Sequence, residues 1–155
     1  MERKTQVRAE DGKQELTITR EFELPVDLLF RAYAEPEIIE QWMGTKVVSF
    51  SGKRHGHWQY QTSDKEGKVV FSANGTFHAF EKDTKIIRTF EMENTGFGVQ
   101  LEFLQFEPLT EDTSKLTVHI LYGSPAERDQ FLKIGMDKGM NMAHNRLQQI
   151  VEKLK

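Results

Sequence analysis

No cysteine occurs among the 155 residues, and this absence excludes disulfide bonds, thiolate metal sites, iron–sulfur clusters and cysteine nucleophiles. An excess of basic charge is also missing, because 21 Lys and Arg residues stand against 24 Asp and Glu residues and the formal net charge is −3. A nearly balanced, slightly acidic chain argues against a nucleic-acid-binding protein that depends on a strongly basic surface. We therefore expect no nucleic-acid partner.

Long apolar runs are absent as well. None approaches the roughly 18 residues of a membrane span, and residues 1–15 lack the apolar core of a signal peptide. The expectation is a cytoplasmic protein without a membrane span. The length is that of one domain, since domains hold about 100–200 residues. We interpret the polar residues 1–14 as a tail or a short edge strand, and 15–155 as a single domain.

Apolar residues make up only 37% of the chain, but many of them are large: 11 Phe, 6 Met and 2 Trp. Their spacing predicts a half-buried strand over 15–22. Pro25 suits the first turn of a helix that follows this strand. Pro36 ends that helix and begins a second one, which Gly44 ends.

Between residues 46 and 122 apolar residues alternate with polar ones, which is typical of strands with one solvent-exposed face. Short turns between the segments predict an antiparallel sheet. Within 97–106 the alternation places Phe97, Leu101 and Phe103 on the inward face. The expected strands are 47–51, 56–62, 69–80, 85–92, 97–106 and 116–122.

The C-terminal region has helical periodicity. Ser124 followed by Pro125 and by Glu127 three residues on is a helix start. Apolar residues then recur at steps of three and four, which predicts one long amphipathic helix or two segments joined near Gly135. The apolar stripe must lie on the apolar face of the sheet. The fold class is therefore α+β, with a space between sheet and helix that side chains or a ligand can fill.

The order strand, Pro, helix, acidic-Pro, helix, Trp runs through residues 16–44, and glycines mark two later strands and the last helix. The residues that carry this order are Pro25, Pro36, Trp42, Gly56, Trp58, Gly75, Gly139 and Leu147. Over about 15–155 the chain resembles the activator of heat-shock protein 90 ATPase homologue family, a branch of the START-like superfamily with the helix-grip fold of the birch-pollen allergen. His57 and Met140 stand where that family has a second Gly and a Trp.

The resemblance implies a curved antiparallel sheet of about six to seven strands around a long C-terminal helix, with a cavity between them. Members of this superfamily bind lipids, polyketides, flavonoids and hormones, and some are cyclases or dehydratases. The ATPase-activating role belongs to eukaryotic co-chaperones in which this domain is joined to a separate chaperone-binding domain. We do not transfer that role to this chain.

Inward-facing positions supply the candidate ligand-binding residues. Aromatic rings offer stacking surfaces for planar ligands, and methionine adapts to varied ligand shapes. The alternative is that the same side chains pack against one another as a core. The candidates are Trp42, Trp58, Tyr60, Phe71, Phe77, Arg88, Phe90, Phe103, Met136, Met140 and His144.

Arg88 shares its strand parity with Phe90, and an inward guanidinium needs an acidic partner or a ligand. The alternatives for Arg88 are a structural ion pair or an exposed side chain. His144 is the histidine best placed for the cavity rim, or else a partly exposed helix residue. Gly135 and Gly139 either remove side-chain volume beside the sheet or serve a close contact or a kink.

Histidines give no convincing metal site. His55 and His57 lie two residues apart and could combine with His78 or His119, but no third ligand has a fixed spacing. No Ser-His-Asp order, paired-carboxylate spacing or phosphate loop occurs either. We therefore expect no metal and no cofactor, and we assign no catalytic residue.

The function expected from these features is binding of a small apolar molecule, planar or lipid-like, in the cavity. One alternative is an enzyme of the same fold, a cyclase, dehydratase or hydrolase, which needs an ionisable pair such as His144 with Asp137 or Tyr60 inside the cavity. Another is a module that binds a chaperone or another regulator, which predicts an exposed apolar patch and a filled cavity. Both a monomer and a homodimer fit the sequence.

Overall fold

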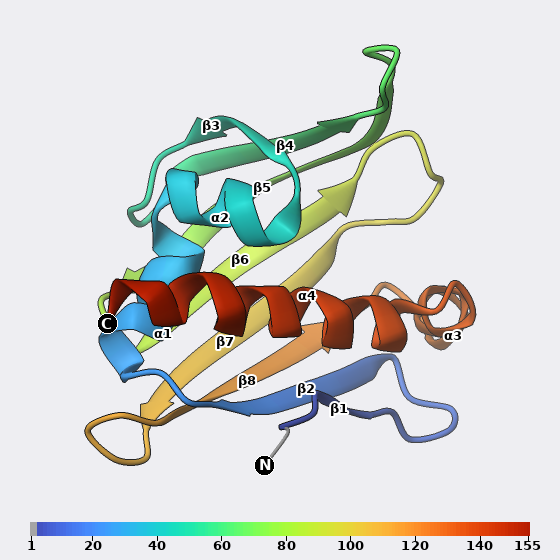
Figure 1. Ribbon diagram of the computed structural model, residues 1–155. Helices are drawn as coiled ribbons and strands as arrows, with labels where there is room; N and C mark the ends of the chain where they lie inside the picture. Colours follow the sequence, from blue (N-terminus) through green and yellow to red (C-terminus); the bar gives the residue numbers. More distant parts are fainter. Residues whose placement is uncertain (1–2) are drawn as a thin grey trace.

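A computed structural model describes residues 3–155, and Figure 1 shows the arrangement of its elements. Within this range no helix is both long and apolar enough to cross a membrane. The strands are β1 (Gln6–Arg8), β2 (Glu15–Phe22), β3 (Lys46–Phe50), β4 (His57–Ser63), β5 (Val69–Glu81), β6 (Lys85–Met92), β7 (Gln100–Pro108) and β8 (Ser114–Leu121). The helices are α1 (Val26–Ala34), α2 (Pro36–Met43), α3 (Pro125–Lys133) and α4 (Met136–Val151), followed by a short 3₁₀ turn, Glu152–Leu154.

The strands form one curved antiparallel sheet in the order β1-β2-β8-β7-β6-β5-β4-β3. Helices α1, α2 and α4 cover the same face, and α4 lies across it (Figure 1). This arrangement confirms the predicted α+β helix-grip fold. The sheet has one strand more than the upper expectation, because residues 6–8 pair with β2 as the edge strand that was one of two interpretations of the N-terminal segment. Residues 1 and 2 of that segment lie outside the described residues.

The helix ends follow the signals in the sequence. Pro25 lies immediately before α1, and Pro36 begins α2. Gly44 ends α2 with a φ of 64°, a conformation that a glycine adopts without strain. At α3 the hydroxyl of Ser124 accepts a hydrogen bond from the backbone N–H of Glu127 over 3.2 Å.

The C-terminal helical region is two helices, which was the second of the two interpretations. Gly135 separates α3 from α4 with a φ of 81°, a left-handed conformation in which a Cβ is disfavoured. Gly139 lies inside α4, where a Cβ would have no heavy atom within 4 Å. The two glycines therefore have different roles: Gly135 permits the turn, whereas Gly139 leaves space open.

Strand β7 corrects the expectation for 97–106. The strand begins at Gln100, and its buried parity is Gln100, Glu102 and Leu104. Phe103 lies on the opposite face, where its ring stacks on His119 with 6.0 Å between ring centroids. The inward assignment of Phe103 was wrong because two polar residues occupy the buried parity, so the more apolar parity is not the buried one here.

The structure explains why a glycine stands at position 75, one of the glycines that carry the family resemblance. It faces the core in β5, and a Cβ there would overlap both the carbonyl oxygen of Thr89 and the indole of Trp58. The missing side chain allows Trp58 to be completely buried on the concave side of the sheet. Aromatic side chains around Trp58 therefore fill the concave side of the sheet at this point of β4 and β5.

Candidate functional site

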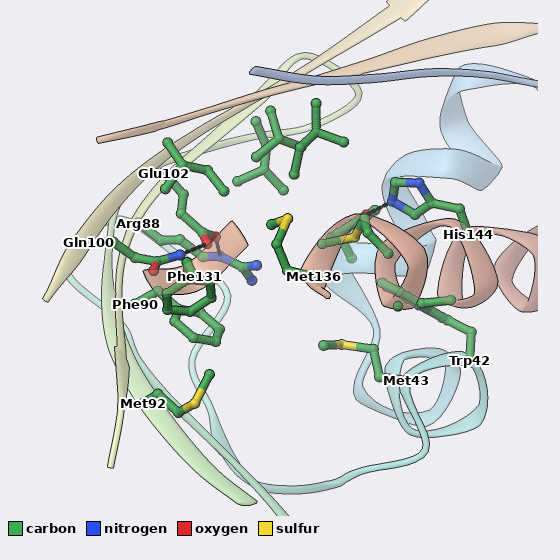
Figure 2. A pocket seen from close by; sticks show the side chains of 18 of the residues that line it. Trp42, Met43, Arg88, Phe90, Met92, Gln100, Glu102, Phe131, Met136 and His144 are labelled. Atoms are coloured by element: carbon green, nitrogen blue, oxygen red, sulfur yellow. Dashed lines mark hydrogen bonds and ion pairs between the residues drawn. The ribbon is translucent and has the colours of Figure 1, made fainter. Parts of the chain in front are cut away.

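A cavity of about 380 Å³ lies between the sheet and α4. Its walls come from α1, α2, several strands of the sheet, α3 and the first half of α4, and Figure 2 shows the open space among their side chains. The volume falls within the roughly 300–1,000 Å³ of small-molecule sites. Seven of the predicted candidates line it: Trp42, Phe71, Arg88, Phe90, Met136, Met140 and His144.

Four other candidates do not reach the cavity. Trp58 and Tyr60 are fully buried and pack on each other with 4.5 Å between ring centroids. Phe77 belongs to a separate aromatic cluster with Phe50, 5.3 Å away. Phe103 is on the outer face of the sheet, as described above. For Trp58, Tyr60 and Phe77 the alternative interpretation as packed core describes their position, since each is buried against other rings.

Methionines contribute much of the apolar wall. Met43 from α2, Met92 from β6, and Met136 and Met140 from α4 line the open space. The first three are labelled in Figure 2. Each of the four is only partly buried, so each has side-chain freedom that a core residue lacks. An unbranched thioether adapts to differently shaped partners. An adaptable thioether therefore lies on each of three walls, those formed by α2, the sheet and α4.

Trp42 and Tyr33 form a firmer wall. The Trp42 indole N–H donates to the carbonyl oxygen of Ala32 over 2.7 Å, which ties α2 to α1. Its ring meets that of Tyr33 edge to face, with 5.1 Å between centroids. Because both rings are fixed by these contacts, this side of the cavity is preformed.

An ion pair lies on the sheet side of the cavity. Arg88 donates from Nε to Oε1 of Glu102 over 2.8 Å, and Gln100 donates from Nε2 to the other carboxylate oxygen over 2.7 Å. The guanidinium also lies over the ring of Trp58, 5.2 Å from its centroid, and over that of Phe90. Burial is the largest single effect and lowers the pKa of Arg88, but Glu102, Tyr60 and Tyr33 together outweigh burial, and the pKa is raised.

Arg88 therefore points inward and has the acidic partner that an inward arginine needs. The alternative of an exposed side chain was wrong, since Arg88 is buried. Figure 2 shows the far end of the guanidinium directed into the open space. The side chain thus meets both remaining descriptions, as a structural ion pair and as a polar group at the cavity wall.

His144 lies at the opposite end of the cavity (Figure 2). Its Nδ1 is 2.7 Å from the hydroxyl of Thr5, and its Nε2 is 3.4 Å from the hydroxyl of Tyr33. Burial and, to a smaller extent, the positive charge of Arg20 lower the pKa of His144 to about 3. The imidazole is completely buried, so the alternative of a partly exposed helix histidine was wrong.

The ionisable pairs suggested for a catalytic site do not form. Asp137 is exposed on α4, and Tyr60 lies outside the cavity wall. The phenol that meets His144 is Tyr33, which the sequence analysis did not single out. Among residues 3–155 no group of three His, Asp or Glu residues is arranged to hold a metal ion.

Several lining residues escaped the sequence analysis for identifiable reasons. Met92 continues the parity of Arg88 and Phe90, so this signal was present in the sequence. Glu102 lies directly opposite Arg88 in the pairing of β6 with β7, and only the register between the strands reveals it. Phe131 comes from α3, the first of the two C-terminal helices, and also lines the cavity.

Comparison with known proteins identifies one matching family and several solved structures with a similar fold. The model of the family described as Activator of Hsp90 ATPase homolog 1-like protein matches residues 23–152. Protein Ms6760 from Mycobacterium smegmatis has 22% sequence identity and a TM-score of 0.83, over 95% of this chain and 96% of that chain. A Rhodobacter sphaeroides protein has 20% identity and a TM-score of 0.86, over 97% and 99% of the two chains.

An Arthrobacter aurescens protein solved by NMR is also similar, with 17% identity and a TM-score of 0.84 over 96% of this chain and 91% of that chain. At these identities the similarity is one of fold. None of the curated proteins matches the chain.

Proposed function

The chain belongs to the Activator of Hsp90 ATPase homolog 1-like family, and from this premise we propose that it binds one small, largely apolar molecule in the cavity between the sheet and α4. The observation that carries the proposal is the cavity itself: about 380 Å³ lined mainly by apolar side chains, with polar groups confined to its two ends. Small-molecule sites combine a preformed apolar space with a few placed polar groups in this way.

The wall chemistry favours a planar or lipid-like occupant. Phe71, Phe90 and Trp42 offer ring faces and edges, and the methionines among them adapt to the outline of the bound molecule. Gly139 supports the same proposal, because a side chain at this position would project into the space that a ligand needs. The burial of apolar ligand surface supplies most of the expected affinity.

Binding is favoured over catalysis by the state of the ionisable groups. Glu102 already accepts hydrogen bonds from Arg88 and Gln100, and both ring nitrogens of His144 have partners. A general base needs a free acceptor within reach of the proton that it removes. Each carboxylate oxygen of Glu102 and each ring nitrogen of His144 is already engaged by a neighbouring residue, so a substrate proton would compete with these contacts.

Binding is also favoured over a role as a chaperone-binding module. That alternative predicts a filled cavity, whereas the space beside α4 is open. Exposed large apolar residues such as Val70, Ile134 and Met142 come from different elements, and single exposed apolar residues are ordinary on protein surfaces. The open cavity is thus the stronger indication.

The proposal is tested by titrating the protein with prodan, an uncharged naphthalene ketone dye whose fluorescence changes when it leaves water. We expect saturable binding at one site, lost or strongly weakened in Gly139→Leu, whose side chain occupies part of the cavity. Lys138→Leu places the same side chain on an exposed position of α4 and should bind as the parent protein does. Absence of saturable binding, or equal binding by Gly139→Leu and the parent, would overturn the proposal.

A further inference from the structure

A chain of hydrogen bonds runs from β2 through the N-terminal segment to the cavity. Arg20 donates from Nη1 to the Thr5 hydroxyl over 3.4 Å, and Thr5 Oγ1 lies 2.7 Å from Nδ1 of His144. A guanidinium can only donate, so Nδ1 is the one partner of the Thr5 hydroxyl among the described residues that can accept the hydroxyl proton, and we place that proton there. Nδ1 is then the acceptor nitrogen, and the neutral imidazole carries its proton on Nε2.

The second imidazole nitrogen, Nε2, then donates its proton toward the Tyr33 hydroxyl. Nε2 lies 3.4 Å from the phenol oxygen, and His144 is the one hydrogen-bond partner of this phenol among residues 3–155. Because the Nε2–H donates, the phenol oxygen accepts, and the proton of Tyr33 remains available to the cavity that the ring lines. Burial raises the pKa of Tyr33, so the phenol keeps that proton.

The groups that order this chain are themselves held in place. Arg20 is buried and donates to Oδ1 of Asn145 in α4 over 2.8 Å. The backbone N–H of Thr5 donates to Oδ1 of Asn141 over 3.0 Å, which fixes the N-terminal segment on the same helix. The ring of Tyr33 is fixed by its edge-to-face contact with Trp42. The direction of the hydrogen bonds is therefore built into the fold.

The cavity also lacks net charge. Among the described residues that line it, Arg88 is the one permanent cation, and the Glu102 carboxylate neutralises it at 2.8 Å. His144 is uncharged near neutral pH because burial and Arg20 keep its pKa at about 3. A bound carboxylate would lose its hydration without an unpaired cation to replace it.

We infer that the cavity selects an uncharged apolar molecule that carries a carbonyl-type acceptor oxygen, and that Tyr33 is the donor that recognises this oxygen. Thr5 and His144 are positioning residues, because they orient the Tyr33 proton without touching the ligand oxygen. This inference rests on the proposed function and narrows it to a class of ligand.

The selection is tested with three naphthalene ligands of matched size: prodan, its analogue with a propyl group in place of the ketone side chain, and a naphthalene carboxylate. In the parent protein the carboxylate should bind more weakly than the ketone. Tyr33→Phe removes the hydroxyl but keeps the ring, and it should lower the affinity ratio of ketone to propyl analogue about 3- to 10-fold. Tyr122→Phe, which removes a buried hydroxyl outside the cavity wall, should leave the ratio unchanged.

The positioning role is tested separately by ¹⁵N NMR of the imidazole. The parent protein should show His144 protonated on Nε2 and not on Nδ1. Thr5→Val, which keeps the shape of the side chain but not the hydroxyl, should abolish this single tautomer and lower the ketone selectivity. Thr117→Val on the outer face of the sheet should do neither.

The outcomes distinguish the inference from the proposed function. If none of the three ligands binds, the proposed function fails and the inference fails with it. If they bind but the ratio is the same in Tyr33→Phe as in the parent, or the carboxylate binds as tightly as the ketone, the cavity binds ligands and the inference is overturned. A parent His144 protonated on Nδ1 overturns the relay through Thr5.

Discussion

The two glycines of the C-terminal region should respond in opposite directions to the same substitution. In Gly139→Ala the new Cβ meets no heavy atom within 4 Å and the backbone is ordinary helix. Alanine inside a helix is more favourable than glycine by about 0.5–1 kcal/mol. The free energy of unfolding should rise by that amount, and Tm should rise by about 2–4 °C per kcal/mol in a protein of this size.

In Gly135→Ala the same methyl group is placed on a residue with a φ of 81°. A left-handed conformation costs an L-residue about 1–2 kcal/mol, so the free energy of unfolding should fall by about that amount. Urea denaturation followed by circular dichroism measures both variants under one set of conditions. The two substitutions change composition identically, so each serves as the control of the other.

The reasoning would be refuted if Gly139→Ala destabilised the protein, or if both substitutions shifted stability in the same direction. The first result would mean that α4 packs tightly at this position and that no open space exists beside it. The expected result would show that stability and ligand binding respond in opposite directions at position 139. A side chain there strengthens the helix, but it also takes up space that a ligand needs.

Three further predictions concern buried groups. Arg88→Met should lower the free energy of unfolding by about 3–5 kcal/mol, because it leaves the Glu102 carboxylate buried without its cation, and the double variant with Glu102→Leu should recover most of this loss in urea denaturation. The pKa of His144 is about 3 in the folded protein, against about 6.5 for an unfolded histidine, so only the unfolded chain binds the proton between these values. The contribution of neutral His144 to the free energy of unfolding is therefore complete above about pH 6.5, and it falls by up to about 1.4 kcal/mol per pH unit as the pH is lowered toward 3. If the free energies of unfolding of the parent protein and of His144→Gln changed in parallel over this pH range, the prediction would be contradicted. Gly75→Ala should destabilise by about 3 kcal/mol or more, since its Cβ overlaps backbone as well as Trp58, and near-parent stability in thermal unfolding would refute that packing argument.

The helix boundaries could be predicted from the sequence because the signals are local. Pro36, Gly44 and Ser124 each act through their own backbone or the next turn. The α+β class was predictable for a related reason, since alternation and helical spacing are read within short windows. The edge strand at 6–8 was less certain, because three residues carry no period.

The polar part of the site could not be predicted, because it depends on contacts between distant segments. Arg88 meets Glu102 across two strands whose register the sequence does not reveal, and this pair reverses the apparent inward face of β7. His144 and Thr5 are 139 residues apart. Strand alternation and helical spacing predicted that large apolar residues gather on the inward face, but whether Trp58 packs there or lines an open space depends on Gly75.

The central claim is that a ligand occupies the space beside α4, and the methionines allow it to be tested most directly. Four methionines line the cavity: Met43, Met92, Met136 and Met140. Met142 is exposed on α4 and serves as an internal reference. In a protein labelled with ¹³C at the methionine methyl groups, the four cavity signals should shift together and saturably on titration with prodan while that of Met142 stays fixed. Four unmoved cavity signals, or an equal shift of Met142, would contradict the account.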